Sequence, residues 1–256
     1  MQLGLGISPT QPYGVAVPAF TPASISGLQL WLDASDASTL FTDSAGTTPA
    51  TADGDPVGCW RDKSGNGYHV TQTDGTAKPL RQNSAQNGRM AINFDGINDR
   101  LIRSSTFTLA QPFSVFIVLN NYSIVTAPVF IDSYDNVQCV IYNGSSFDNS
   151  GFLNLTAGAS LSVKIASPTF PALIYAVFNG SSSKININNN SIANGNAGTN
   201  SLTGISLGNI RGNPNPVVSS YAFNGYYCEL IIYNSELNLS STNAVSNYLN
   251  SKWSIY

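Results

Sequence analysis

The most constraining feature of this sequence is a succession of short β-type segments separated by clusters of Gly, Asn, Asp, Ser and Pro. Residues 184–188 alternate isoleucine with polar side chains, the pattern of a strand with one buried face. Residues 113–119 are apolar almost throughout and predict a central strand buried on both faces. Because such strands are buried only when sheets pack on each other, the pattern predicts an all-β sandwich.

One segment has helical periodicity. Val245, Leu249 and Trp253 recur at spacings of four, and Asn238 stands in front of them as a capping residue. Lys252 in the last turn suits the helix dipole. We therefore expect one short C-terminal helix that covers an edge or an end of the sandwich.

Residues 1–24 have a different character, with several prolines and glycines and no lasting period. We expect an extended N-terminal arm over 1–24 and a folded domain over 27–256. Proline limits the backbone to extended conformations before any partner binds, which lowers the entropic cost of ordering such a segment on a partner. The apolar residues of the arm that we expect to make assembly contacts are Leu3, Leu5, Ile7, Tyr13, Val15, Val17 and Phe20.

Charge excludes two classes of partner. The 256 residues include 11 Lys and Arg against 14 Asp and Glu, a net charge of −3, and the cations are scattered. Nucleic-acid binding and polybasic membrane contact both need clustered cations, so we expect neither. No apolar stretch approaches the roughly 18 residues of a membrane span, and the N-terminus has no secretory pattern. We therefore expect a chain made in a cytoplasm, without membrane insertion.

Cysteine and carboxylate counts limit the available chemistry. Cys59, Cys139 and Cys228 form an odd set without a CxxC pair, which predicts free thiols and no zinc site.

Glycoside hydrolysis needs two close carboxylates. The two glutamates, Glu229 and Glu236, are seven residues apart across the end of a strand, so hydrolysis would need an Asp that converges in space.

Four motifs, in this order, resemble the concanavalin A-like, laminin-G-like jelly-roll domains. The motifs are GLQLWLD at 27–33, WRDKSGNG at 60–67, FDGIND at 94–99 and FNGYYCELIIYN at 223–234, followed by a helix that ends at Lys252 and Trp253. The resemblance covers residues 27–256. It implies an antiparallel two-sheet jelly-roll sandwich.

Laminin-G-like domains often hold calcium, which prefers oxygen ligands. The best local oxygen cluster is Asp95, Asn98 and Asp99, and Asp62 with Asn66 is a second. The competing interpretation, which we favour, is that these side chains form Asx turns within their own loops. No other cofactor is expected.

The chain also resembles stand-alone laminin-G-like proteins among bacteriophage structural genes. That resemblance implies a non-catalytic virion component, a capsid or tail decoration (cement) protein held by its arm, whose partners are other virion proteins and copies of itself. The alternative is a carbohydrate-binding adhesin or receptor-binding module, because many tyrosines accompany Asn-rich loops. A glycoside hydrolase is the third interpretation.

Overall fold

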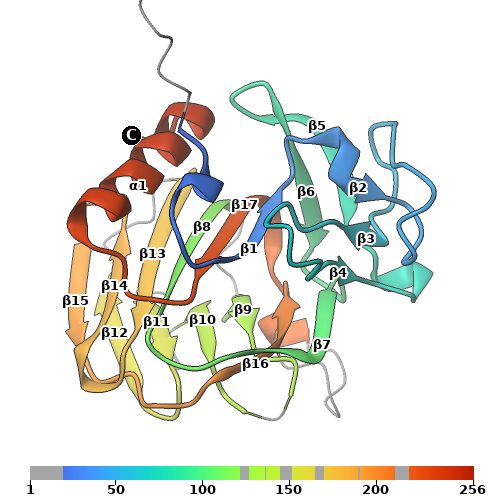
Figure 1. Cartoon of the computed structure of the whole chain (residues 1–256). Coiled ribbons are helices and arrows are strands. Elements are labelled where there is room, and N and C mark those ends of the chain that lie inside the picture. Colours follow the sequence, from blue (N-terminus) through green and yellow to red (C-terminus); the bar gives the residue numbers. More distant parts are fainter. Residues whose placement is uncertain are drawn as a thin grey trace, which may run out of the picture.

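The computed structural model describes residues 20–121, 127–135, 137–144, 152–164, 170–189, 191–210 and 219–256. They form two antiparallel sheets that pack face to face, with one α-helix on the outside (Figure 1). The sequence-based prediction of an all-β two-sheet sandwich with a C-terminal helix is confirmed.

The first sheet has eight strands, in the order β15-β14-β13-β8-β17-β6-β5, and β1 also pairs with β17. Its strands are β1 (Leu28–Asp33), β5 (Leu80–Gln86), β6 (Arg89–Asp95), β8 (Phe113–Asn121), β13 (Ala172–Phe178), β14 (Ser183–Ile187), β15 (Ser191–Gly195) and β17 (Asn224–Tyr233). The predicted central strand is β8, which lies between β13 and β17.

The second sheet has nine strands, in the order β12-β11-β10-β9-β16-β7-β4-β3-β2. Its strands are β2 (Leu40–Phe41), β3 (Cys59–Trp60), β4 (Val70–Thr71), β7 (Leu101–Leu109), β9 (Val129–Asp132), β10 (Val140–Asn143), β11 (Phe152–Thr156), β12 (Ser160–Lys164) and β16 (Leu202–Leu207).

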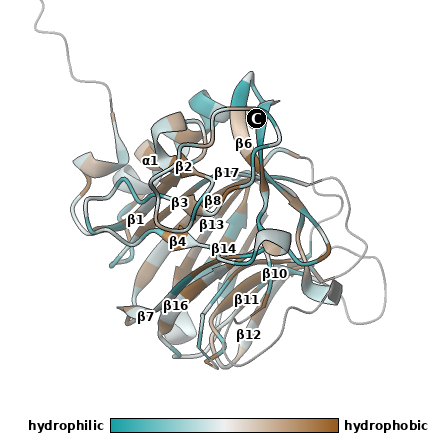
Figure 2. Ribbon diagram, turned by 90° about the vertical axis from the view of Figure 1, so that its right-hand side faces the viewer, coloured by the Kyte–Doolittle hydropathy of each residue, from teal (hydrophilic) through white to brown (hydrophobic). Residues whose placement is uncertain are grey.

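The protein has two hydrophobic clusters, one on each side of the first sheet. The inner cluster lies between the sheets and includes Trp60, Phe94 and Phe113. The outer cluster includes Phe116 and Trp253 and lies between the first sheet and the helix. Strand β8 contributes side chains to both clusters, which explains why its sequence is apolar without alternation. Figure 2 shows hydrophobic residues along the strands of both sheets.

The helix α1 (Leu239–Trp253) covers the outer face of the first sheet. The Asn238 side chain accepts a hydrogen bond of 2.9 Å from the backbone N–H of Ser241, as expected for a helix N-cap. Val245, Leu249 and Trp253 are fully buried, so the period of four in the sequence identified the packed face correctly.

The first described residues, 20–24, pack on the domain. Pro22 is buried in a short 3₁₀ helix, and its carbonyl accepts a 2.9 Å hydrogen bond from the Tyr233 hydroxyl. The Phe20 ring lies 5.8 Å from that of Tyr248, so Phe20 has a partner within its own chain. An assembly contact of Phe20 stays a prediction. The other six predicted contacts, from Leu3 to Val17, lie outside the described residues.

The expectation of free thiols is met. The three cysteines are free and buried, and burial raises the pKa of Cys59 to about 11. Within the described residues, no helix is both long and apolar enough to span a bilayer.

Candidate functional site

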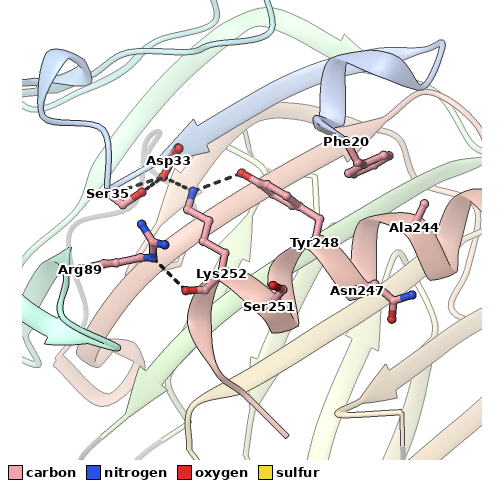
Figure 3. Close-up of a pocket in the computed structure, with 9 residues that line it drawn as sticks. All are labelled: Phe20, Asp33, Ser35, Arg89, Ala244, Asn247, Tyr248, Ser251 and Lys252. Carbon is pink, nitrogen blue, oxygen red and sulfur yellow. Dashed lines mark hydrogen bonds and ion pairs between the residues drawn. The ribbon is translucent and has the colours of Figure 1, made fainter. Parts of the chain in front are cut away.

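A pocket of about 700 Å³ opens beside the C-terminal half of α1, where the end of β1 and the start of β6 meet the helix (Figure 3). It is lined by Phe20, Asp33, Ser35, Arg89, Ala244, Asn247, Tyr248, Ser251 and Lys252. This site, called the helix pocket below, contains two aromatic rings, a carboxylate, two cations and several groups that form hydrogen bonds.

A β-bulge sets the orientation of the carboxylate behind the pocket. In the pairing of β17 with β8, Tyr227 lies opposite Leu119 and Glu229 opposite Val118, so one residue of β17 is extra. An extra residue reverses the face to which the following side chains point. Tyr227 therefore packs in the inner cluster, whereas Glu229 faces the helix.

Lys252 joins two carboxylates. Asp33 and Glu229 are direct neighbours across the β1–β17 pair. The Lys252 ammonium lies 2.6 Å from Asp33 Oδ1 and 2.8 Å from Glu229 Oε2. A second ammonium, that of Lys63, lies 2.9 Å from Asp33 Oδ2. Asp33 is 4% exposed and Glu229 is 0% exposed, so Lys252 joins two buried carboxylates, whereas Lys63 pairs with Asp33 and, at 2.8 Å, with Asp36.

Three neutral donors complete the environment of Glu229. Trp31 Nε1 donates to Oε1 at 2.7 Å, Trp253 Nε1 donates to Oε2 at 2.7 Å, and the Tyr248 hydroxyl donates to Oε1 at 2.9 Å. Burying a carboxylate is tolerated only when it is paired and hydrogen bonded, and Glu229 meets both conditions. The network ties α1 to strands β1 and β17.

The two carboxyl groups are shifted in opposite directions. Burial raises the pKa of Glu229, the negative charge of Asp33 adds to the rise, and Lys252 offsets part of it. Burial also acts on Asp33, but the two lysines and Ser35 outweigh it and lower the pKa of that carboxyl. Glu229 therefore holds its proton more firmly than an ordinary carboxyl group, and Asp33 ionises more readily.

The hairpin between β5 and β6 places Arg89 at the rim of the pocket. Asn87 and Gly88 form its two-residue turn, both with positive φ (48° and 68°), a geometry that Asn-Gly favours. Asn87 Nδ2 and Arg89 Nε donate to the Lys252 carbonyl at 3.0 and 2.9 Å. Side chains of the hairpin thus satisfy a carbonyl of the last helical turn and fix the rim of the pocket to the helix end.

The opposite wall is aromatic. The rings of Phe20 and Tyr248 are tilted by 57° to each other. Asn247 and Ser251 are exposed on α1 and belong to the same lining (Figure 3). An aromatic wall beside amide, hydroxyl and guanidinium groups suits a ligand with apolar ring faces and hydroxyl edges.

The two carboxylates of the possible calcium cluster accept hydrogen bonds from backbone N–H groups. The Asp95 carboxylate accepts hydrogen bonds from the N–H groups of Ile97 (2.8 Å) and Asn98 (3.3 Å), and Asp99 Oδ2 accepts from the Asp95 N–H at 2.9 Å. These contacts match the Asx-turn interpretation. Among the described residues, no group of three or more His, Cys, Asp or Glu side chains could hold a metal ion. A calcium site built with backbone oxygens stays a prediction.

Asp99 gives this loop a pH-dependent stability. Burial raises its pKa to about 7, although the N–H of Asp95 opposes the rise. The pKa of this carboxyl is higher in the folded protein than in the unfolded chain, so protonation of Asp99 favours the folded state at low pH. This contribution to the free energy of unfolding is lost as the pH rises through 7. We expect Asp99→Asn to stabilise the protein at pH 8 by roughly 2 kcal/mol and to have little effect at pH 4. Urea unfolding at both pH values tests this, and an equal effect at both would contradict it.

Sequence reasoning missed the helix pocket. The sequence presents Glu229 as a possible hydrolytic carboxylate that needs a converging Asp and Lys252 as the end of a helix, but it does not single out Asp33, the Asp that lies opposite Glu229, or Arg89. One signal was present: Glu229 lies within the apolar run 226–233, where a charge needs a partner. The sequence does not say which of the scattered cations is that partner.

Several solved structures share this fold. Domain 4 of an extracellular GH43 arabinanase from Geobacillus stearothermophilus, solved with arabinotriose, matches with a TM-score of 0.56 and 16% identity over 85% of this chain and 97% of that domain. A GH54 α-L-arabinofuranosidase matches with a TM-score of 0.58 and 15% identity over 77% of this chain and 51% of the enzyme. Trypanosoma rangeli sialidase matches with a TM-score of 0.54 and 9% identity over 89% of this chain and 33% of the enzyme.

The chain therefore spans nearly all of the arabinanase domain, about half of the arabinofuranosidase and about a third of the sialidase. At these identities the matches establish the fold. The chain matches no family model and no curated protein sequence.

These matches correct the functional prediction. The non-catalytic virion component, whether capsid or tail decoration, is wrong, because the matching structures come from an arabinanase, arabinofuranosidases and a sialidase. The expectation that the chain is not an enzyme is overturned by the same matches. They favour the carbohydrate-binding alternative, and the link to bacteriophage proteins has no support.

Proposed function

We propose that this protein is a carbohydrate-binding domain with a laminin-G-like sandwich, and that the helix pocket holds the sugar. The observation that carries the proposal is the match to the arabinanase domain solved with arabinotriose, which extends over 97% of that domain. The match therefore extends over nearly all of a domain that was solved with a sugar.

The lining of the helix pocket supports the proposal. A pyranose or furanose ring presents C–H groups on its faces, which pack against aromatic rings, and hydroxyls at its edge, which need donors and acceptors. Tyr248 and Phe20 supply rings, and Asn247, Ser251 and Arg89 supply polar groups around them. The buried Asp33–Lys252–Glu229 network holds this surface rigid, which lowers the entropic cost of binding.

Two asparagines on α1 provide a matched test. Asn247 lines the pocket, whereas Asn243 is also exposed, one turn earlier, and does not line it. A single lost hydrogen bond is worth about 0.5 to 1.5 kcal/mol, so we expect Asn247→Ala to weaken sugar binding about threefold to tenfold. Asn243→Ala should bind like the unchanged protein. Calorimetry with the best ligands from a glycan array, arabinotriose included, measures both, and equal affinities would contradict the placement of the site.

Hydrolysis of a glycosidic bond is the second candidate function. It is favoured by the close pair of carboxyl groups behind the pocket, whose pKa values shift in opposite directions as an acid and its partner require. Lys252 lies between them, so a substrate would have to displace its ammonium. Incubation of each bound oligosaccharide with the protein separates the two functions: constant reducing ends identify a binding domain, and their release identifies a hydrolase.

A further inference from the structure

One cation of the helix pocket has no carboxylate partner among the residues that the structure describes. The lining contains one carboxylate, Asp33, and two cations, Arg89 and Lys252. Behind the lining, Lys63 and Lys252 are taken up by three carboxylates, those of Asp33, Asp36 and Glu229. Arg89 is therefore the group at the open side of the pocket that can pair with a negatively charged ligand.

The two cations of the lining are not equivalent. The Lys252 side chain is 11% exposed and is held by Asp33 and Glu229. Arg89 is exposed and forms no ion pair with any residue that the structure describes. Its Nε is committed to the Lys252 carbonyl, which fixes the plane of the guanidinium at the rim (Figure 3).

Arg89 and Tyr248 belong to one surface. Burial raises the pKa of Tyr248, and the positive charge of Arg89 offsets part of that rise, as expected of a cation close to the phenol. A ligand that packs on the Tyr248 ring therefore has a guanidinium within reach of its substituents. Arginine suits a planar carboxylate in particular, because its parallel N–H groups match the two carboxylate oxygens.

We propose that the helix pocket binds an acidic sugar, a uronic or sialic acid residue, whose carboxylate pairs with Arg89. The proposal rests on the carbohydrate-binding function and adds the class of sugar. The sugar ring packs against Tyr248 and Phe20, and its hydroxyls meet Asn247 and Ser251 at the mouth. The carboxylate distinguishes this ligand from neutral arabinose chains.

Pairs of ligands that differ only in the acidic group test the proposal. Trigalacturonic acid is compared with its methyl ester, and 3′-sialyllactose with lactose, by calorimetry on the full chain. We expect the acid of at least one pair to bind about tenfold or more tightly than its neutral counterpart. The pair that responds identifies the source, uronic or sialic. The preference should shrink as sodium chloride is raised, because the charge pair is near solvent.

Three arginine variants assign the preference to one residue. Arg89→Gln should abolish the difference between acid and neutral forms, and Arg89→Lys should retain only part of it, because an ammonium cannot bind both oxygens in parallel. Arg61→Gln is the matched control: Arg61 is also exposed and also donates one hydrogen bond to a carbonyl, that of Gly46 at 2.7 Å. This control should retain the full preference. Thermal melting of each variant verifies folding.

The remaining outcomes separate this inference from the proposed function. Equal binding of acid and neutral forms, weakened by Asn247→Ala, would overturn the acidic-sugar inference and leave carbohydrate binding intact. An acid preference that survives Arg89→Gln would overturn the role of Arg89. Absence of binding to every sugar on the array would overturn both proposals.

Discussion

Lys252→Met is expected to lower the free energy of unfolding by about 3 to 5 kcal/mol, the usual cost of removing one partner of a buried ion pair. Lys252 is the cation that touches both Asp33 and Glu229, and Glu229 is 0% exposed. Methionine fills a similar volume, so the loss reports the charge and not a cavity. Without the ammonium the pKa of Glu229 rises further. The deficit should therefore be larger at pH 8 than at pH 5, where the carboxyl can take up a proton.

Lys184→Met is the matched control for that change. Lys184 forms an ion pair with Glu236 at 2.5 Å, but the two side chains are 44% and 29% exposed. Exposed pairs contribute about 0 to 1 kcal/mol, so this variant should unfold almost like the unchanged protein. Urea unfolding of both variants at pH 5 and pH 8 measures the difference. Similar effects of the two changes would show that the Lys252 network does not stabilise the helix contact.

Trp253 is expected to give the second large effect, and two substitutions separate its two roles. Trp253 is 0% exposed, packs in the outer cluster and donates to Glu229 at 2.7 Å. Trp253→Ala removes both contributions and should cost about 3 to 5 kcal/mol. Trp253→Phe keeps most of the ring and removes the donor to a buried carboxylate, which should cost about 1.5 to 3 kcal/mol.

Helical circular dichroism and urea unfolding together distinguish the two variants. Trp253→Ala should lose helical signal before the β-sheet signal, because the indole holds the end of α1 on the sheet. Trp253→Phe should unfold in one transition at lower urea. If Trp253→Phe is as stable as the unchanged protein, the hydrogen bond to Glu229 contributes nothing measurable.

The fold was predictable because its signals are local. Period two in β14, the unbroken apolar run in β8 and the period of four in α1 each report burial within a single segment. Each of these elements can be identified without knowing what it packs against. The sandwich then follows from the rule that apolar faces must be covered. The two-residue strands β2, β3 and β4 were not predicted, because two residues cannot show a period.

The site was not predictable for the opposite reason. Asp33, Glu229 and Lys252 meet through contacts between residues far apart in the chain. The face to which Glu229 points depends on a bulge in β17 that strict alternation would miss. Arg89 reaches the helix end only because an Asn-Gly turn starts β6 at that residue. Each of these is a property of the assembled fold.

The functional prediction failed at a different step. It inferred a role in assembly from a proline-rich arm and from likeness to phage proteins, although one fold serves many functions. The residues that would carry that role, apart from Phe20, lie outside the described structure. Phe20 itself packs on Tyr248 at the wall of the helix pocket.

A crystal structure of the protein with its tightest-binding saccharide would locate the sugar. We expect a sugar ring against Tyr248, with its polar groups directed to Asn247, Ser251 and Arg89. A saccharide bound on another face, with the helix pocket empty at saturating concentration, would contradict this expectation.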